Sequence, residues 1–206
     1  MLNALWFKPD GGAESYAEYG EAVAPLLANV GAEMLFPPLP VERTLEGDFD
    51  PDLILLVRYP SKEAFGGMWR TDEYAKIAHL RTDALTKAVL TRCALDPAES
   101  PAIKELPDGI ILFETLTFNE GGREPYYEYL RRANALSEPR GAGILSPKLI
   151  PLKSLADEFM PDLVMLAHYP SLETLYEVAS TPEYKEFAPL RGQAVKHGNA
   201  VVCRRG

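Results

Sequence analysis

One stretch of the chain occurs twice, and this repeat limits the possible folds more than any other feature. Residues 51–81 read PDLILLVRYPSKEAFGGMWRTDEYAKIAHLR, and residues 161–191 read PDLVMLAHYPSLETLYEVASTPEYKEFAPLR. Positions 2–93 align with positions 112–203 without a gap, and 31 of the 92 aligned positions are identical. Self-similarity at a fixed period indicates a repeated structural unit. We therefore expect two copies of one fold.

Each copy predicts the order strand, helix, strand, strand, helix, strand. Apolar runs that end at Pro, Gly or Asn predict strands, and apolar residues at helical spacing predict the first helix. Ser or Thr followed by an acidic residue predicts a helix N-terminus. In the first copy we expect strands at 2–7, 32–36, 53–59 and 89–95, a helix at 14–29, and helix caps at Ser61 and Thr71. In the second copy we expect strands at 110–118, 143–145, 163–169 and 200–204, a helix at 124–138, and helix caps at Ser171 and Thr181. The second strand of each copy runs into a Pro-rich segment, which predicts an irregular or edge strand.

This order indicates an α+β fold of two ferredoxin-like βαββαβ repeats. Each repeat makes a four-stranded antiparallel sheet with both helices on one face, so the other face is apolar and needs a partner. The two copies can pack sheet to sheet around a pseudo-twofold axis as a single-chain, pseudo-dimeric α+β barrel. We expect repeats at 1–95 and 110–206, joined by a Pro-rich acidic linker at 96–109. The protein is then a monomeric pseudo-dimer or a homodimer.

The charge balance argues against two classes of partner. The chain has 21 Lys and Arg against 30 Asp and Glu, a formal net charge of −9. Nucleic acids and anionic membranes bind clustered Lys and Arg, so we expect neither as a partner. No apolar run reaches the roughly 18 residues of a membrane span, and the N-terminus does not resemble a signal peptide, which predicts a cytoplasmic protein. The three histidines lack metal-ligand spacing, and no nucleotide motif occurs, so we expect no metal and no cofactor.

The repeated motif resembles a known family. The pattern Y-P-S-x-E-A…M-W-R-T-D-E-Y…L-R is similar to the F-P-S-x-E-A…S-P-E-Y…R signature of small bacterial proteins without assigned function. These proteins belong to the dimeric α+β-barrel (ferredoxin-like) superfamily. Tyr19 and Tyr129 fall where the family has a helical tyrosine, and Gly31 and Gly141 fall at its Gly-Gly turn. The resemblance implies a fold shared by cofactor-independent oxygenases, cyclases, haem-degrading enzymes, isomerases and non-catalytic proteins.

The chain departs from that family in two respects. Family members usually carry one copy and dimerise, whereas this chain contains two copies. The family commonly has Arg-Gly after the second strand, where this chain has Pro37-Pro38 and Pro147-Lys148. A role of that arginine in the family therefore does not transfer here.

A tyrosine and an arginine recur in both copies as a candidate binding pair. Tyr74 and Arg81, and their counterparts Tyr184 and Arg191, are spaced by two helical turns and share one face of a helix. A phenol and a guanidinium on one face suit a pocket that binds a carboxylate or enolate oxygen. Alternatively, the tyrosines are structural and each arginine pairs with a nearby glutamate: Glu63, Glu73, Glu173 or Glu183.

Positions that differ between the copies give a second set of candidates. The ungapped alignment pairs Arg58 with His168 and Ala4 with Glu114. His168 has a pKa suited to a general base, and Glu114 of the same copy could orient its ring. Arg58 could bind substrate, or it could form a buried ion pair with Glu114. Both interpretations remain open.

Two classes of function fit these residues. The tyrosines of the first helices, including Tyr19 and Tyr129, suit either a pocket for flat ligands or plain packing on a sheet. The first hypothesis is a cofactor-independent enzyme, similar to an oxygenase, cyclase or isomerase, that acts on a small aromatic or enolisable carboxylate. The alternative is a non-catalytic ligand-binding or structural, oligomerising protein. A pocket in one copy alone favours the enzyme, and equivalent pockets in both copies favour ligand binding.

Overall fold

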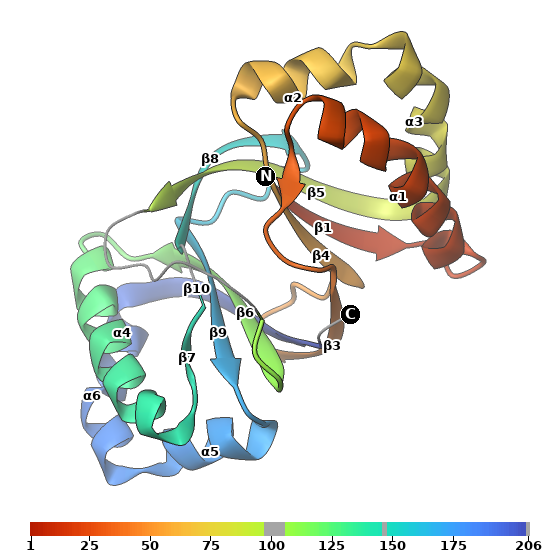
Figure 1. The fold of residues 1–206 in the computed structure, drawn as a ribbon. Helices are drawn as coiled ribbons and strands as arrows, with labels where there is room; N and C mark the ends of the chain where they lie inside the picture. The colour runs from red at the N-terminus through yellow and green to blue at the C-terminus, as the bar shows by residue number, and fades with distance from the viewer. Residues whose placement is uncertain (97–105, 146–147, 205–206) are drawn as a thin grey trace. The chain divides into compact units, whose positions relative to one another are not determined.

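The computed structural model describes residues 1–96, 106–145 and 148–204, and both halves run through the same order of elements (Figure 1). Most of the expected linker, at 97–105, lies outside the described residues. The first half contains β1 (Leu2–Phe7), α1 (Gly12–Asn29), β2 (Glu33–Met34), β3 (Leu39–Glu46), β4 (Leu53–Arg58), α2 (Lys62–Trp69), α3 (Asp72–Ala84) and β5 (Leu85–Asp96). The second contains β6 (Ile110–Phe118), α4 (Arg123–Ser137), the 3₁₀ helix η1 (Glu138–Arg140), β7 (Gly143–Ile144), β8 (Lys148–Ala156), β9 (Leu163–Tyr169), α5 (Leu172–Ser180), α6 (Pro182–Ala194) and β10 (Val195–Cys203).

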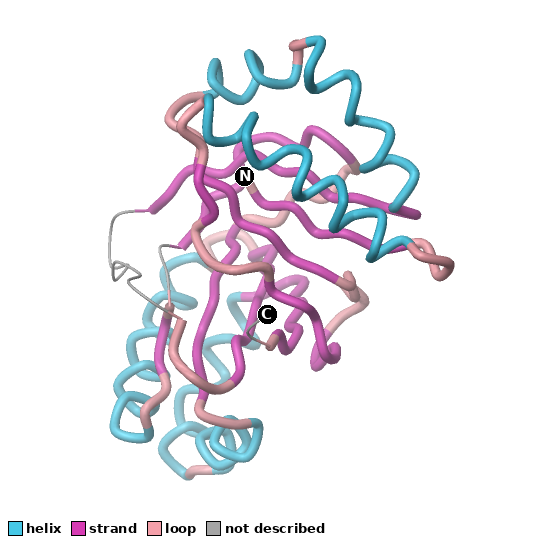
Figure 2. Tube along the Cα trace, turned by 45° about the vertical axis from the view of Figure 1, so that its right-hand side comes forward, coloured by secondary structure: helices cyan, strands magenta, loops and turns pink. Residues whose placement is uncertain are grey.

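Unit 1, the first of two compact units, is built mainly from the first half of the chain. It comprises Met1–Pro38, Pro51–Arg92 and Ser154–Phe159. In its antiparallel sheet β1 pairs with β4 and β5, and β2 pairs with β4. The resulting order β5-β1-β4-β2 is that of a ferredoxin-like unit. Helices α1 and α3 lie together on one face of this sheet (Figures 1 and 2), where Tyr16 and Val23 pack with Leu5.

Unit 2 has the corresponding sheet in the second half of the chain. It comprises the described parts of Leu39–Asp50, Cys93–Lys153 and Met160–Gly206. Here β6 pairs with β9 and β10, and β7 pairs with β9, which gives the same order, β10-β6-β9-β7. Helices α4 and α6 pack against each other, and the hydrophobic core of the unit includes Leu116, Tyr126 and Leu163. The α+β class expected from the sequence is confirmed.

The strand β3 was not expected from the sequence, which predicted an irregular Pro-rich segment there. It belongs to unit 2, where it pairs with β10 so that Glu46 lies opposite Ala200. Pro40 is compatible with this strand because it lies near its start, and its carbonyl accepts a hydrogen bond from the Arg204 backbone N–H at 3.0 Å. Segment Ser154–Phe159 of the second half likewise belongs to unit 1. Each unit therefore contains a segment of the other half, which the order of the repeats does not reveal.

The first strands of the two halves are offset by one position from the ungapped alignment. Leu5 pairs with Leu53 in β4, whereas Leu116 pairs with Leu163 in β9. The counterpart of Glu114 is therefore Asn3, and the ungapped pairing with Ala4 was wrong. Four residues separate Phe7 from Gly12, but only three separate their counterparts Phe118 and Gly122, so the alignment slips there. Since neighbouring residues of a strand face opposite sides, the slip exchanges the two faces.

The helix starts follow the sequence closely. The hydroxyl oxygens of Ser61 and Ser171 accept hydrogen bonds from the backbone of Ala64 and Thr174, at 3.0 and 3.2 Å. Thr71 and Thr181 cap α3 and α6 in the same way. The two threonine caps begin the helices that carry the repeated tyrosine and arginine.

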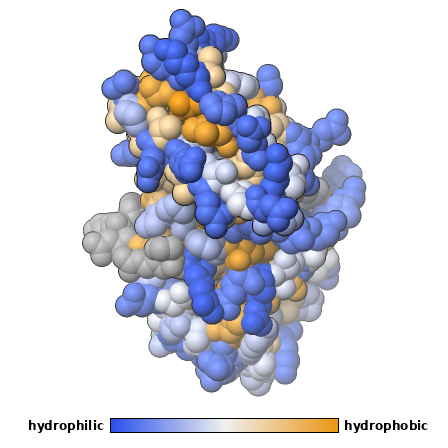
Figure 3. All heavy atoms as spheres, turned by 90° about the vertical axis from the view of Figure 1, so that its right-hand side faces the viewer, coloured by the Kyte–Doolittle hydropathy of each residue, from blue (hydrophilic) through white to orange (hydrophobic). Residues whose placement is uncertain are grey.

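One face of the molecule can be described by its hydropathy. The face seen in Figure 3 is largely hydrophilic, with smaller hydrophobic areas between the polar side chains. Among the described residues, no helix combines the length and apolar character that crossing a bilayer requires.

Candidate functional site

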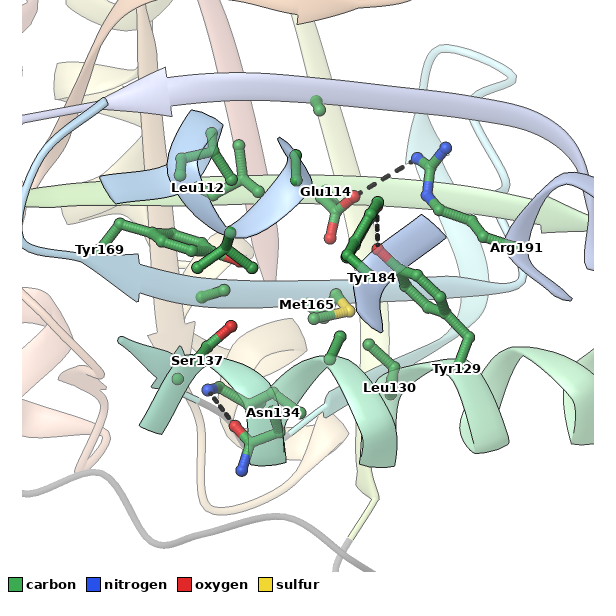
Figure 4. A pocket seen from close by; sticks show the side chains of 18 of the residues that line it. Leu112, Glu114, Tyr129, Leu130, Asn134, Ser137, Met165, Tyr169, Tyr184 and Arg191 are labelled. Carbon is green, nitrogen blue, oxygen red and sulfur yellow. Dashed lines mark hydrogen bonds and ion pairs between the residues drawn. The ribbon is translucent and has the colours of Figure 1, made fainter. Parts of the chain in front are cut away.

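Each unit contains a cavity lined by residues of its sheet and its helices. The cavity of unit 1 has a volume of about 510 Å³, and that of unit 2 has a volume of about 230 Å³ (Figure 4). Both are lined by an arginine from the last helix, a tyrosine from the first helix and a tyrosine at the end of the third strand of the ferredoxin-like order. These residues are Arg81, Tyr19 and Tyr59 in unit 1, and Arg191, Tyr129 and Tyr169 in unit 2. The two cavities are thus equivalent in position.

In unit 2 the arginine is neutralised by carboxylates of the chain itself. Arg191 donates from Nη1 and Nη2 to the two carboxylate oxygens of Glu46, at 3.1 and 2.5 Å. Its Nη2 also lies 3.4 Å from Oε1 of Glu114 (Figure 4). The Glu46 contact is a bidentate arginine–carboxylate pair, the strongest common form of this interaction. Gly198 makes room for it, because a Cβ there would lie 2.7 Å from the Glu46 carboxylate.

Burial and neighbouring charges shift the pKa values of this cluster in opposite directions. Burial raises the pKa of Glu114 above its ordinary value, and the neighbouring Arg191 offsets only part of that effect. Burial alone would lower the pKa of Arg191, but Glu114 and then Glu46 outweigh it and raise that pKa. Arg191 is therefore held as a cation between Glu114 and Glu46, with the bidentate contact made by Glu46.

In unit 1 the equivalent arginine has no carboxylate partner in the part of the chain that the structure describes. Among the described residues, Arg81 forms no ion pair, and its buried Nη2 has no hydrogen-bond acceptor. The positions that supply acids in unit 2 hold Asn3 in place of Glu114 and Ala156 in place of Glu46. Asp157 follows Ala156 with φ 65°, as Gly47 follows Glu46 with φ 77°, which supports this pairing of positions. The guanidinium of Arg81 is thus partly buried beside the Tyr16 hydroxyl, with no carboxylate partner among the described residues.

Tyrosine hydroxyls adjoin the arginine in both cavities. The hydroxyl oxygens of Tyr19 and Tyr74 are 3.4 Å apart in unit 1, and those of Tyr129 and Tyr184 are 2.9 Å apart in unit 2. Burial raises the pKa of Tyr19 and of Tyr129 far above the usual value. Burial also raises the pKa of Tyr16 to about 12, against the opposing effect of the adjacent Arg81. These phenols keep their protons at neutral pH and can donate hydrogen bonds to an anion.

Smaller and less polar residues line the cavity of unit 1. Gly20 lies where unit 2 has Leu130, a buried side chain with 6% exposure. A Cβ added at Gly20 would meet no atom within 4 Å, so the space that Leu130 fills is empty in unit 1. Ala24 and Leu27 line unit 1 where Asn134 and Ser137 line unit 2. The unit 1 cavity is consequently both wider and more apolar.

The structure does not bring His168 and Glu114 together. On β9, His168 pairs with Ile111, whereas Glu114 pairs with Met165. The His168 ring donates from Nε2 to the Asp108 carbonyl at 2.6 Å, and His168 does not line either cavity. Glu114 instead contacts Arg191.

The remaining sequence candidates divide between the two cavities and the surface. Arg58 is exposed and forms an ion pair with Glu33, so it neither lines a cavity nor contacts Glu114. Neither Arg81 nor Arg191 pairs with the helix glutamates considered as alternatives; Arg191 pairs with Glu46. The unit 1 cavity is lined by Tyr19 and Arg81, and Tyr74 contacts Tyr19. The unit 2 cavity is lined by Tyr129, Tyr184 and Arg191.

Sequence reasoning missed Glu46, Asn3 and Gly20. The difference between Glu46 and Ala156 is visible in the aligned copies and was the available signal for the first of them. Asn3 was hidden by the one-residue slip in the first strand. Within the parts of the chain that the structure describes, no three His, Cys, Asp or Glu side chains cluster as metal ligands.

Comparisons with known proteins indicate the fold and leave the activity open. Residues 12–91 match the model of a "Domain of unknown function (DUF1330)". No curated protein matches the chain. Among solved structures, the chain is similar to a proposed monooxygenase from Lactobacillus acidophilus NCFM, with a TM-score of 0.55 and 10% sequence identity, over 98% of this chain and 90% of that one.

Two further structures show the same likeness. An anthrone oxidase-like protein has a TM-score of 0.56 and 13% identity, over 98% of this chain and 89% of its own. A proposed chlorite dismutase has a TM-score of 0.56 and 10% identity, over 98% and 92%. The α+β-barrel fold class expected from the sequence is confirmed by these likenesses. Identities this low carry the fold and not the chemistry.

Proposed function

We propose that the chain is a tandem duplication that binds a small aromatic or otherwise apolar carboxylate in the cavity of unit 1. Arg81 receives the carboxylate, and the tyrosines around it donate hydrogen bonds. The observation that carries the proposal is the buried Nη2 of Arg81, which has no acceptor among the described residues. A buried cation without a counter-ion is unfavourable unless a ligand supplies the missing charge and hydrogen bonds.

The shape of the cavity fits such a ligand. Its volume of about 510 Å³ lies in the range of small-molecule sites, which are mostly apolar with a few placed polar groups. Val23, Leu27 and Leu55 line its apolar part, and Tyr16, Tyr19 and Tyr59 add aromatic surface. One guanidinium in an apolar, aromatic cavity favours a single carboxylate on an aromatic or aliphatic body over a polyanion or a sugar.

The binding interpretation is favoured over the enzyme because both units contain a cavity and the His168–Glu114 pair is not formed. One feature keeps turnover as a second candidate. The Tyr19 and Tyr74 hydroxyls form a pair in the same unit as Arg81, and burial keeps Tyr19 protonated. Protonated phenols beside an arginine can stabilise an enolate oxygen of a bound keto acid, without a cofactor.

A thermal-shift screen tests the proposal. Benzoate, phenylacetate and phenylpyruvate would be compared with the neutral analogue phenylacetamide, on the wild type and on Arg81→Gln. Arg58→Gln is the matched control, since that arginine is exposed. We expect carboxylates, and not the amide, to raise the Tm of the wild type and the control while leaving Arg81→Gln unchanged. Equal stabilisation of Arg81→Gln, or no stabilisation of the wild type, would contradict the proposal. Consumption of phenylpyruvate in the same samples would identify turnover.

A further inference from the structure

We infer that the chain has one carboxylate site rather than two, because the Glu46 carboxylate occupies in unit 2 the place that the ligand's carboxylate takes in unit 1. This inference rests on the proposed function. Unit 2 is then an internally occupied copy of the binding site. The occupant belongs to β3, a strand that unit 2 receives from the first half of the chain.

The two sites are built from corresponding residues on equivalent helices, so they can be compared residue by residue. Arg81 and Arg191 are aligned positions of the repeat and lie on equivalent helices, α3 and α6. The hydroxyl pairs of Tyr19 with Tyr74 and of Tyr129 with Tyr184 recur beside them. The two guanidinium groups therefore start from the same surroundings, and the difference between the units lies in what faces them.

In unit 2 the place in front of the guanidinium is filled. Glu46 binds both terminal nitrogens of Arg191, at 3.1 and 2.5 Å, which is how a ligand carboxylate would bind. Glu114 adds a second carboxylate at 3.4 Å. An incoming anion would have to displace Glu46 and would still meet the charge of the displaced group. Such a site disfavours anionic ligands.

In unit 1 each part of this arrangement is missing. Ala156 and Asn3 replace the two glutamates. Ala88, the counterpart of Gly198, carries the Cβ that in unit 2 would collide with the Glu46 carboxylate. Pairing of Ala88 with Leu5, and of Gly198 with Leu116, establishes that these two positions correspond. Three differences thus agree in direction, since each leaves Arg81 open.

The larger cavity is the one that contains Arg81, and the smaller is the one in which Glu46 binds the arginine. The open guanidinium lies in the cavity of about 510 Å³, and the occupied one lies in the cavity of about 230 Å³. Gly20 against Leu130 accounts for part of this difference. Space for a ligand body and a free cation therefore occur in the same unit, as a binding site requires.

Titration calorimetry with phenylacetate tests the inference by counting sites. We expect one site per wild-type chain, and a second, weaker site for the double variant Glu46→Ala/Glu114→Asn, which gives unit 2 the unit 1 residues in front of the arginine but keeps Leu130 in the cavity. A wild type with two sites, or a folded double variant with one site, would overturn the inference. A wild type without any binding would instead contradict the proposed function, so the two failures are distinct.

The reciprocal variant decides the question if the double variant does not fold. Asn3→Glu places in unit 1 the carboxylate that Glu114 supplies in unit 2, and Asn3→Gln is the uncharged control of the same length. We expect Asn3→Glu to weaken phenylacetate binding more than about tenfold and to raise the Tm, since a charge-assisted hydrogen bond contributes at least that factor. Unchanged affinity in Asn3→Glu, or equal weakening in Asn3→Gln, would overturn the inference.

Discussion

The cavities of unit 1 and unit 2 are built from corresponding residues, but they differ in what faces the arginine. Both present an arginine and a pair of tyrosine hydroxyls, yet Arg191 is bound by Glu46, whereas Arg81 has no carboxylate partner within the described part of the chain. In unit 2 the guanidinium is neutralised by the chain itself, whereas in unit 1 the buried Nη2 has no acceptor among the described residues. The residues common to the two copies line both cavities in the same way, and under the proposed function a few differing residues decide which copy binds a ligand.

The largest expected effect comes from exchanging the residues that set the cavity volumes. Leu130→Gly should lower the free energy of unfolding by about 4 kcal/mol, because it empties a buried site and adds a helix glycine. Gly20→Leu should raise it by about 1 kcal/mol and weaken phenylacetate binding at least tenfold, by filling the unit 1 cavity. Urea unfolding and calorimetry measure both changes. Gly20→Ala controls for helix propensity and should retain binding; loss of binding in Gly20→Ala would contradict this explanation.

Removing each arginine in turn should change the stability of the protein to different extents. Arg191→Met leaves Glu114 buried without its cation and should cost about 2–3 kcal/mol, less than for a fully buried pair because Glu46 stays 41% exposed. Arg81→Met removes an unpaired cation and should leave the stability unchanged or raise it by up to about 1 kcal/mol. Urea unfolding of both variants provides the test. Equal losses would show that Arg81 has a structural partner after all.

The contributions of the two tyrosine pairs to the free energy of unfolding should differ less than those of the two arginines. Tyr184→Phe removes a hydroxyl contact of 2.9 Å and should cost about 1 kcal/mol, whereas Tyr74→Phe removes one of 3.4 Å and should cost about half as much. Double-mutant cycles with Tyr129→Phe and Tyr19→Phe would isolate the two coupling energies. A larger coupling in unit 1 than in unit 2 would be the contrary result.

The smallest expected effect is a pH dependence that belongs to unit 2. Burial raises the pKa of Glu114, so the native protein keeps a proton that the unfolded chain releases near pH 4.5. The stability contributed by this group therefore falls as the pH rises from about 4.5 through the native pKa. Glu114→Gln lacks this loss, and its Tm relative to the wild type should rise over that window and then level off. Thermal unfolding from pH 4 to 9 measures it; a difference that falls with pH would contradict the assignment.

Local patterns were sufficient to predict much of the fold. The apolar runs, the Ser61 and Thr71 caps and their counterparts gave the element order, because strands, caps and helix faces depend on neighbouring residues. The strand β3 was not predicted, because its partner, β10, lies at the far end of the other half of the chain. The prolines in and before β3 also suggest an irregular segment. Long-range pairing leaves no local signal.

The site was predicted only in part for related reasons. Arg81, Arg191 and the tyrosines stood out because both copies contain them, and the structure places them at or beside the cavities. Glu46 was not considered, since its contact with Arg191 depends on the placement of β3 in unit 2. Asn3 was missed because one additional turn residue shifted the alignment of the first strand, and a shift of one residue exchanges the two faces of a strand.

The most direct test follows the two arginines during a titration. In a ¹H–¹⁵N correlation spectrum of arginine side chains, with Arg81→Lys and Arg191→Lys used for assignment, phenylacetate would be added to the wild type. The Nε–H signal of Arg81 should shift and saturate at one equivalent of bound ligand, while that of Arg191, held by Glu46, stays in place. A protein that binds phenylacetate while Arg81 remains unmoved, or while Arg191 shifts with the same affinity, would contradict the division between the two units.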